Sequence, residues 1–533
     1  MNYIKNYIEE RMGGFANEQI KYESDELPKN NNYRKRGYVQ AFKDSICEFS
    51  KKFYSIADED LTDSDDESTN DNTNNNKENI SDLFDNMRNS STISHNRDNN
   101  NSGAVDIVLD LHYGDNGKGA IIDHLLSTGK YDIAVRQTGS SNCGHVVYVD
   151  GEKYVFHMMP TGIIHDNVIA VIGSNCVIPL DELELELKGL FGFNTTLEKF
   201  ADRLKISDRA HITLPIYKEI DRWIENSRGA GKIGSTLKGV GPAYTAKHAR
   251  NGIRICDLYY PDYLRECLNS LSELYERSYP GITMNIEDTM EYLSSYAEKI
   301  KYNIIDIGSY LNKELKNGAN IIVEGSQGMS LDINNGNYPF VTSTECGVSS
   351  VLSGLSISHV YIRDVIGVIK TYATRVGSGP FVTELTDITG SKLQEIGREV
   401  GSTSGRRRRC GWLDLYNIGY NAMISGVNVL NINKLDILDS FDEISLCVGY
   451  EDSNGNRLNS YPASPKELEE CRPIYIVLPG WCVNTSTIRE FDKLPLNAQV
   501  FIDIIQDELR KYCSELNVRY VKNGPDREQI ITL

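Results

Sequence analysis

A carboxylate stands within a glycine-rich segment that has the composition of a phosphate-binding loop. The segment reads Gly114-Asp115-Asn116-Gly117-Lys118-Gly119. Backbone N–H groups of such a turn, together with the positive end of a following helix, converge on a phosphate, and Lys118 adds a mobile cation. Phosphate would repel the Asp115 carboxylate unless that group holds a metal ion or moves a proton. We therefore expect Asp115 to do both.

The residues that flank this loop predict the elements that must position it. Branched apolar residues at 105–109 indicate a buried strand, and Ile121, Ile122, Leu125 and Leu126 repeat with the period of a helix. The loop differs from the standard P-loop, because no Ser or Thr follows the lysine. On its own it is explained equally well by an ordinary turn between a strand and a helix.

From Ala104 onward the pattern predicts one large α/β unit. Apolar strand candidates alternate with helical patterns, and they lie at 132–136, 168–172, 320–323, 365–372, 427–431, 443–450 and 519–522. This alternation predicts a large, mostly parallel twisted sheet with helices on both faces. Ligand loops gather at the carboxyl ends of parallel strands, so the polar turns after these strands should face the glycine-rich loop.

Three of these turns carry side chains that could recognise a ligand. His145 ends the turn after 132–136 and is a candidate general acid, although an isolated histidine is more often structural. Lys434-Leu435-Asp436 follows the strand candidate 427–431, and a carboxylate there accepts from both N1–H and the amino group of guanine. Gln327, after the strand candidate 320–323, has the donors and the acceptor to read a base or a ribose.

Basic residues concentrate in two segments of an otherwise acidic chain. The segment 231–252 mixes glycines with Lys238, Lys247 and Arg250, and it reads as a basic loop or as a solvated charged face. The segment 402–412, STSGRRRRCGW, has four consecutive arginines. A nuclear-localisation patch is one interpretation, but a loop between glycines suits bidentate binding of carboxylates or phosphates better.

The composition of the chain argues against several classes of protein, namely membrane-spanning, secreted and nucleic-acid-binding proteins. The chain has 533 residues, a net charge of −19 and a mean hydropathy of −0.39. No apolar run reaches the roughly 18 residues of a membrane span, and no secretory h-region is evident, so we expect a cytoplasmic location and no membrane partner. The acidic balance argues against a nucleic-acid surface. Eleven cysteines without CxxC pairs indicate neither a zinc site nor a disulfide framework.

The first 102 residues differ in kind from the rest. They include an acidic, Asn-rich tract at 58–79 that cannot bury enough apolar surface to fold, so we predict a low-complexity, largely disordered extension at 1–102. Within it, apolar residues at 38–56 have helical spacing. That helix would either pack on the parent domain or dock a partner. The catalytic domain is predicted at 103–533.

Taken in order, these segments resemble adenylosuccinate synthetase over residues 104–533. The matching stretches are GDNGKG, NCGH, GSTLKGVGPAY, KHARNGIRICDL, EGSQG, YPFVTS, TRVGSGPF, GRRRRCGWLD, NKLD, PGW and GPDR. The resemblance implies a P-loop-NTPase-like fold and a GTP- and Mg²⁺-dependent ligase. That enzyme would join IMP to L-aspartate through 6-phosphoryl-IMP, the first committed step of AMP synthesis from IMP.

The resemblance also implies roles for residues. Asp115 would take the N1 proton of IMP and coordinate one Mg²⁺ per subunit beside the Gly144 carbonyl, and His145 would hydrogen-bond and protonate at O6. IMP would contact Asp115, Asn116, Gly117, Lys118, Asn142, Cys143, Gly144, His145, Thr236, Gln327, Thr342, Arg406 and, from the other subunit of a homodimer, Arg250. Aspartate would contact Ser402, Thr403, Ser404, Gly405, Arg406 and Arg408. The co-substrate GTP would contact Gly114, Asp115, Asn116, Gly117, Lys118, Gly119, Gly144, His145, Arg408, Lys434, Leu435, Asp436 and Gly524.

Several positions depart from the pattern of the family. The residues concerned are Asn116 in place of an acidic residue, Ala120 in place of lysine, Val146 in place of threonine, Ser140-Ser141 in place of Gly-His, and Lys522-Asn523 in place of Ser-Thr. They leave two alternatives to a working IMP–aspartate ligase. One is a divergent ligase acting on another purine nucleotide such as dGMP, although phage enzymes of that kind lack the catalytic Asp. The other is a catalytically impaired nucleotide-binding protein whose extension recruits partners.

Overall fold

The structure is a computed structural model that describes residues 102–149, 151–400 and 407–533. At its centre lies β1 (Val105–Asp110), the strand predicted before the glycine-rich loop, and every residue of β1 is buried. The predicted helix after the loop is α4 (Lys118–Ser127). The predictions for 1–101, including the helix at 38–56, and those for 402–406 lie outside the described residues.

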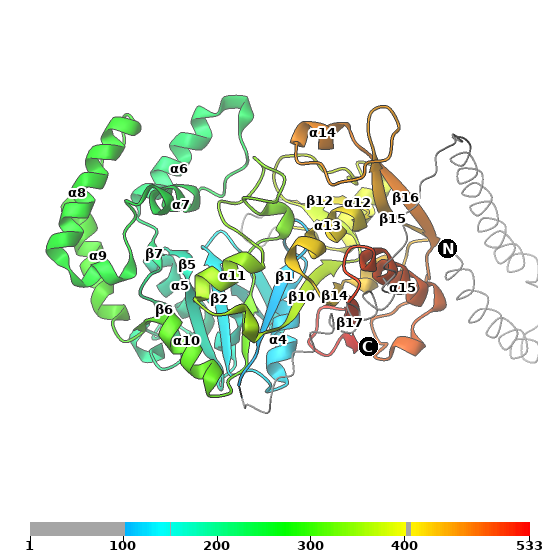
Figure 1. Cartoon of the computed structure of the whole chain (residues 1–533), viewed down its shortest axis with the longest axis horizontal. Helices are drawn as coiled ribbons and strands as arrows, with labels where there is room; N and C mark the ends of the chain where they lie inside the picture. Colours follow the sequence, from blue (N-terminus) through cyan, green and yellow to red (C-terminus); the bar gives the residue numbers. More distant parts are fainter. Residues whose placement is uncertain (1–101, 150, 401–406) are drawn as a thin grey trace, which may run out of the picture. The chain divides into compact units, whose positions relative to one another are not determined.

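The predicted parallel sheet is confirmed as an 11-stranded sheet in the described part of the chain (Figure 1). Every pairing in it is parallel except that of the edge strand β18 with β17. In order across the sheet, the strands are β18 (Ile530–Thr532), β17 (Asn517–Lys522), β14 (Val429–Asn433), β10 (Ile362–Lys370), β1, β9 (Ile321–Glu324), β2 (Ile133–Gly139), β5 (Ile169–Ile178), β6 (Leu204–Ser207) and β8 (Ile304–Ile305), with β7 (His211–Ile212) also paired to β5.

Helices cover both faces of this sheet, as the buried residues of β1 show. Alternate side chains point to opposite faces of a strand. Ile107 and Leu109 belong to a core that includes Leu311 of α10, whereas Val108 belongs to a second core with Ile121 of α4. The helices are α4, α5 (Leu180–Phe191), α6 (Ile216–Ser227), α7 (Val240–Ala249), α8 (Pro261–Ser278), α9 (Ile286–Ile300), α10 (Ile307–Lys316), α11 (Val348–Leu355), α12 (Ile388–Ile396), α13 (Leu415–Ser425), α14 (Pro465–Glu470) and α15 (Leu496–Arg510).

Three smaller sheets complete the described chain. They pair β3 (His145–Val149) with β4 (Glu152–Phe156), β11 (Ala373–Arg375) with β12 (Arg409–Gly411), and β13 (Leu413–Asp414) with β15 (Glu443–Glu451) and β16 (Arg472–Pro479). The strand predicted at 443–450 is therefore present, but it lies outside the main parallel sheet. Its antiparallel partner β16 is mostly half-exposed, although residues 474–478 form a continuous apolar run.

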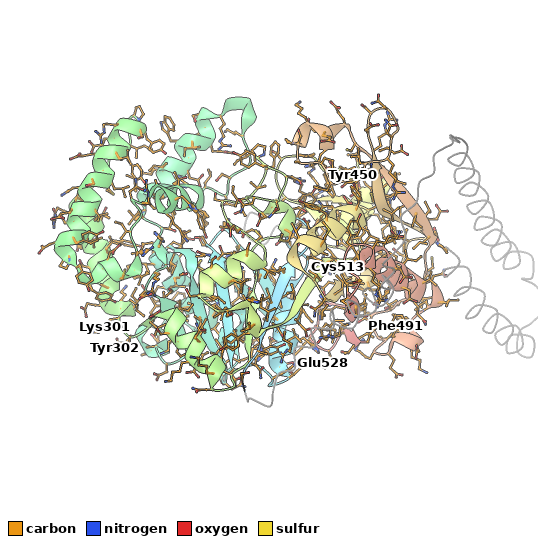
Figure 2. All side chains as sticks on the ribbon, viewed as in Figure 1. Lys301, Tyr302, Tyr450, Phe491, Cys513 and Glu528 are labelled. Atoms are coloured by element: carbon orange, nitrogen blue, oxygen red, sulfur yellow. The ribbon has the colours of Figure 1, made fainter. Side chains whose placement is uncertain are left out.

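One buried pair joins the small sheet of β15 to α13. Asp414 is the N-cap of α13, where its side chain accepts from the backbone N–H of Asn417 at 3.1 Å. It also accepts from the hydroxyl of Tyr450 on β15, a residue labelled in Figure 2. Burial raises the pKa of Asp414 to about 6, against the lowering effect of these hydrogen bonds. None of the helices among residues 102–149, 151–400 and 407–533 combines the length and apolarity needed to cross a membrane.

Candidate active site

Asp110, the last residue of β1, holds the glycine-rich loop in place through hydrogen bonds to its carboxylate. Its carboxylate accepts from the backbone N–H groups of His112 at 3.0 Å, Gly114 at 3.1 Å and Asn116 at 3.0 Å. The side-chain amide of Asn116 adds a fourth hydrogen bond at 2.8 Å. A single buried carboxylate thus fixes the curvature of the loop. Sequence reasoning missed this residue, although a carboxylate between a buried strand and a glycine-rich turn was a usable signal.

Gly117 begins α4 in a conformation that favours glycine. It is the N-cap, with φ of 93°, and a Cβ atom there would lie 2.6 Å from Nδ2 of Asn433. The Asn433 side chain in turn donates to the backbone carbonyl of Asn116. The end of β14 is therefore held directly against the loop. No side chain in the described residues caps the start of α4, and Lys118, Gly119 and Ala120 line the pocket.

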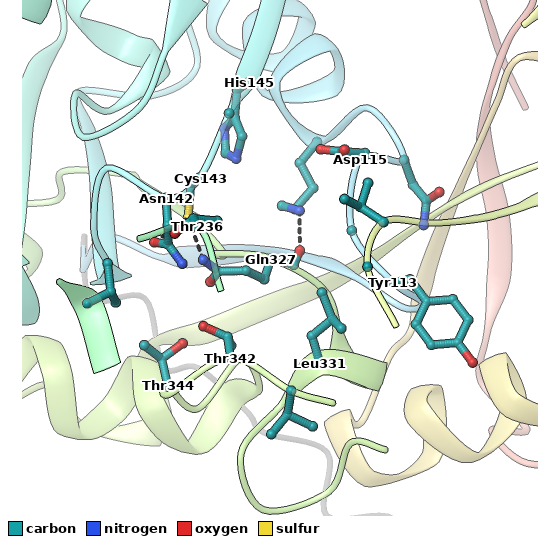
Figure 3. A pocket seen from close by; sticks show the side chains of 18 of the residues that line it. Tyr113, Asp115, Asn142, Cys143, His145, Thr236, Gln327, Leu331, Thr342 and Thr344 are labelled. Carbon is teal, nitrogen blue, oxygen red and sulfur yellow. Dashed lines mark hydrogen bonds between the residues drawn. The ribbon is translucent and has the colours of Figure 1, made fainter. Parts of the chain in front are cut away.

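Lys118 and Gln327 join the loop to the turn after β9. The Lys118 Nζ is buried and donates to the backbone carbonyl of Gln327 (Figure 3). Gln327 donates through Nε2 to Sγ of Cys143 at 2.8 Å, and its φ of 43° is unusual for a non-glycine residue. In the described chain its buried Oε1 has no donor. That oxygen is available to a ligand.

The Asp115 carboxylate is paired with a guanidinium group. Oδ2 of Asp115 lies 3.0 Å from Nε and 2.7 Å from Nη2 of Arg408, and the Asp115 side chain is 29% exposed. Asp115 also has a positive φ of 59°, a backbone conformation that non-glycine residues rarely adopt. The loop at 407–408 and the glycine-rich loop are thereby in direct contact.

His145 is oriented by Glu324, the last residue of β9. Nδ1 of His145 pairs with Oε1 of Glu324, whose other oxygen accepts from the backbone N–H of Thr161 at 2.9 Å. Burial lowers the pKa of His145 more than the Glu324 charge raises it. Burial alone would raise the pKa of Glu324, but His145, Arg136 and the Thr161 N–H outweigh it and lower the pKa to about 2. Glu324 is therefore a charged acceptor that fixes the imidazole.

A second buried carboxylate, Glu399, gathers cations from three elements. It accepts from Nζ of Lys370 at 3.1 Å, Nζ of Lys434 at 2.7 Å and Nη1 of Arg408 at 2.6 Å. Burial would raise the pKa of Glu399, and these three charges hold it far below its usual range. Through Arg408 this cluster reaches Asp115. Glu399 therefore links the residues after β14, through Arg408, to the glycine-rich loop.

Asp115, His145 and Arg408 line one cavity of about 1910 Å³, which is larger than the roughly 300–1,000 Å³ of a typical small-ligand site. Figure 3 draws Asp115 and His145 along one side and Thr342 and Thr344 along the other. The predicted site residues that line it are Gly114, Asp115, Asn116, Gly117, Lys118, Gly119, Asn142, Cys143, Gly144, His145, Thr236, Gln327, Thr342, Arg408, Lys434, Asp436 and Gly524. The cavity has room for more than one nucleotide-sized ligand.

Two predicted residues with described positions do not line this cavity. The Leu435 side chain is fully buried in the core. Arg250 is exposed at the C-cap of α7 and does not line the cavity of its own chain. The predicted contacts at 402–406 lie outside the described residues. Sequence reasoning in turn missed Asp110, and it missed Glu324 and Glu399, whose partners lie on other elements.

The residues at the loop fit a magnesium ion. Mg²⁺ takes oxygen ligands and is commonly held by one or two carboxylates together with phosphates of the substrate. The Asp115 carboxylate and Gly144 both line the cavity. No cluster of three or more His, Cys, Asp or Glu side chains suited to a metal occurs among the residues with described positions. The donor set thus suits an ion that takes most of its ligands from a nucleotide.

Comparison with known proteins gives one consistent result. The family model described as adenylosuccinate synthetase matches residues 107–531. The adenylosuccinate synthetase of Trichoplax adhaerens is 40% identical over 438 residues, covering 82% of this chain and 96% of the relative. That of Streptococcus gordonii is 40% identical over 427 residues, covering 79% and 96%. The solved structure of the fully ligated adenylosuccinate synthetase from Plasmodium falciparum has a TM-score of 0.76 and 36% identity, covering 81% of this chain and 100% of that one. The chain belongs to the adenylosuccinate synthetase family.

Proposed function

We propose that this cavity joins IMP and L-aspartate to form adenylosuccinate, with GTP converted to GDP and phosphate. Membership of the adenylosuccinate synthetase family supports this reaction, and with it the need for GTP and Mg²⁺ and a role in AMP biosynthesis. The observation that carries the assignment to the site is the Asp115 carboxylate, held by Arg408 within a phosphate-binding loop. We place the reaction in the cytoplasm, as is general for the family.

In the first step Asp115 accepts the N1 proton of IMP. The electrons of the N1–H bond delocalise onto O6, which attacks the γ-phosphorus of GTP, and GDP leaves. His145, fixed by Glu324, hydrogen-bonds to O6. Lys118 and the N-terminus of α4 stabilise the negative charge on the transferred phosphoryl group, which is the main way in which proteins catalyse phosphoryl transfer. When bound, Mg²⁺ near Asp115 and Gly144 neutralises phosphate charge.

In the second step the aspartate amine attacks C6 of 6-phosphoryl-IMP. The C6–O6 bond breaks, inorganic phosphate leaves, and the amine loses a proton to give adenylosuccinate. Arg408, together with the segment 402–406, is proposed to bind the aspartate carboxylates, because a guanidinium group pairs with carboxylates in a bidentate manner. Asp436 with Lys434 and Gly524 is proposed to hold the guanine of GTP. Asn142, Thr236, Gln327 and Thr342 are proposed to hold IMP.

We further propose that the chain acts as a homodimer in which Arg250 reaches the IMP phosphate of the other subunit. Arg250 is exposed and is the C-cap of α7, in a left-handed conformation with φ of 64°. It does not line the cavity of its own chain. A role in the partner's cavity is consistent with this position.

The experiment is a turnover assay with purified protein, IMP, GTP, Mg²⁺ and aspartate, followed by the ultraviolet absorbance of the product. We expect adenylosuccinate with IMP and much lower turnover when dGMP replaces IMP. Turnover with dGMP alone would favour the divergent ligase, and GTP binding in calorimetry without any turnover would favour the impaired nucleotide-binding protein. Either result would overturn the proposed reaction.

A further inference from the structure

Asp110 and Asn116 form a buried pair of a carboxylate and an amide next to Lys118. Asn116 donates to Asp110 twice, through its backbone N–H at 3.0 Å and through its side-chain Nδ2 at 2.8 Å. Both residues are buried, but Asn116 lines the cavity and Asp110 does not. The negative charge of the pair therefore lies behind the glycine-rich loop, and the neutral amide lies on the side of the cavity.

Lys118 is held between this pair and the turn after β9. Its Nζ lies 3.5 Å from Oδ2 of Asp110 and donates to the backbone carbonyl of Gln327. Among the residues with described positions, Asp110 is the only carboxylate within ion-pair distance of this buried ammonium group, which would be unfavourable without an anionic partner. An ammonium group has three donors, and these contacts use two of them. The third donor is available to a phosphate oxygen.

Five donors converge on the two oxygens of the Asp110 carboxylate. They are the two donors of Asn116, the Nζ of Lys118, and the backbone N–H groups of His112 and Gly114. This number fills the capacity of a carboxylate, which has about four lone-pair sites. An acidic side chain at position 116 would supply no donor and would bring a second carboxylate against the first. Asp110 therefore requires a neutral donor at position 116, and Asn116 provides it.

Asn116 is one of the departures from the family pattern, which has an acidic residue at this position. We propose that Asp110 supplies the negative charge that the pattern places at 116, and that the pair of Asp110 and Asn116 positions Lys118 for phosphoryl transfer. The proposal rests on the proposed function, in which Lys118 stabilises the transferred phosphoryl group. Asp110 is a positioning residue, because it acts through Lys118 and does not line the cavity.

The first test restores the acidic residue of the family pattern, which should impair this chain. Asn116→Asp places two carboxylates in contact and should lower kcat by about 10-fold or more. Asn116→Ala removes the side-chain donor without adding a charge, so its kcat should fall less. Steady-state kinetics is measured at pH 8, where a proton shared between two carboxylates is disfavoured. The KM for GTP should change less than kcat, because Lys118 acts on charge that develops during the transfer.

The second test exchanges the two side chains. Asp110→Asn removes the charge and should lower kcat by about 10- to 100-fold, the range of one charge-assisted hydrogen bond. The double variant Asp110→Asn/Asn116→Asp returns one carboxylate to the pair, so its kcat should be at least about threefold above that of Asp110→Asn. Thermal unfolding should show both variants to be less stable than wild type, because asparagine at 110 offers one acceptor oxygen where aspartate offers two. Recovery of kcat without recovery of stability separates the charge from the support of the loop.

Asn456→Asp is the matched control. Asn456 donates to Asp452 through its backbone N–H at 2.8 Å and its Nδ2 at 3.1 Å, as Asn116 does to Asp110, but in an exposed turn that does not line the cavity. This variant also brings two carboxylates together, and its kcat and KM values should equal those of wild type. Circular dichroism establishes which variants are folded. If Asp110→Asn does not fold, the order of kcat among wild type, Asn116→Ala and Asn116→Asp decides.

Three kinetic results would overturn the proposal. A kcat of Asn116→Asp equal to or above that of wild type would show that Asp110 tolerates an acidic residue at 116. Equal losses in Asn116→Asp and Asn116→Ala would assign the effect to the missing donor alone. A kcat of the double variant no higher than that of Asp110→Asn would leave Asp110 only the support of the loop.

A wild type without ligation would overturn the proposed function, and the charge pair is then tested by calorimetry of GTP binding. Weaker binding by Asn116→Asp than by Asn116→Ala, with tighter binding by the double variant than by Asp110→Asn, would still assign the charge near Lys118 to Asp110. Any other order would overturn that assignment as well.

Discussion

At the residue scale, the site is built from carboxylates whose surroundings give them different tasks. Asp115 is part-exposed and paired with Arg408, so its carboxylate is accessible to a substrate and can accept a proton from it. Glu324 and Glu399 are fully buried and hold a histidine and three cations in place. The sequence predicted Asp115 and His145, because their loops have recognisable composition. It did not predict Glu324 as the partner of His145, because 178 intervening residues hide their proximity.

Replacement of Glu324 tests its positioning role. In Glu324→Gln the side chain keeps its size but loses the charge that fixes His145, so we expect kcat to fall by about 10- to 100-fold, with a smaller change in the KM for IMP. Steady-state kinetics measures this. Glu384→Gln, which breaks an ion pair with Arg409 away from the cavity, is the matched control. Equal kinetics in wild type and Glu324→Gln would contradict the positioning role.

At the element scale, the glycine-rich loop is held by contacts on both of its sides. Asp110 organises the loop from β1, and Asn433 contacts it from β14. Seven strands of the main sheet were predicted from apolar runs, since strands buried on both faces show no alternation, whereas β6, β7, β8 and β18 were not predicted. The exact ends of the strands and the pairing of β15 were not predicted either, because pairing depends on contacts that are distant in the chain. The hairpin of β3 and β4 was missed; its residues mix buried, half-buried and exposed positions.

A glycine pair tests the contact between the loop and β14. Gly117 and Gly129 both have positive φ, of 93° and 71°, but a Cβ atom at 129 meets nothing within 4 Å, whereas one at 117 meets Asn433. Gly117→Ala should therefore lower the free energy of unfolding by more than Gly129→Ala, which carries only a backbone penalty of about 1 kcal/mol. Thermal unfolding with and without GTP measures both variants. We expect stabilisation by GTP to be lost in Gly117→Ala alone; equal behaviour of the two would contradict the contact.

At the scale of the whole molecule, one cavity collects loops from the carboxyl ends of several parallel strands. β1, β9, β14 and β17 are each followed by a residue that lines it. The sequence predicted this convergence from the α/β alternation, and the family resemblance supplied the order of the motifs. The size of the cavity and the cluster at Glu399 could not be predicted, because they depend on packing among segments that are far apart in sequence.

Mixed dimers test whether Arg250 completes the partner's site. Arg250→Leu and Asp115→Asn should each be nearly inactive alone. A mixed dimer has one site with both Asp115 and Arg250 intact, so random mixing should restore activity to about a quarter of wild type. Activity is measured after the two variants are mixed under conditions that allow subunit exchange. No recovery, in dimers shown to exchange, would contradict a role across the interface.

Removal of the extension tests the predicted domain boundary. Because the family match begins at residue 107, deletion of residues 1–100 should leave kcat and the KM values for IMP, GTP and aspartate largely unchanged. The full chain and the shortened chain are compared in the same turnover assay. A large loss of kcat in a folded shortened chain would assign the extension to the catalytic unit.

The central claim is that Asp115 removes the N1 proton and so makes O6 a nucleophile. The most direct measurement uses GTP labelled with heavy oxygen in the bridge between the β- and γ-phosphates, incubated with IMP and Mg²⁺ but without aspartate. Reversible transfer to O6 lets the β-phosphate of GDP rotate, so wild type should move the label out of the bridge only when IMP is present. Asp115→Asn, shown by calorimetry to bind GTP, should leave the label in place. Movement of the label at the wild-type rate in Asp115→Asn would contradict the account.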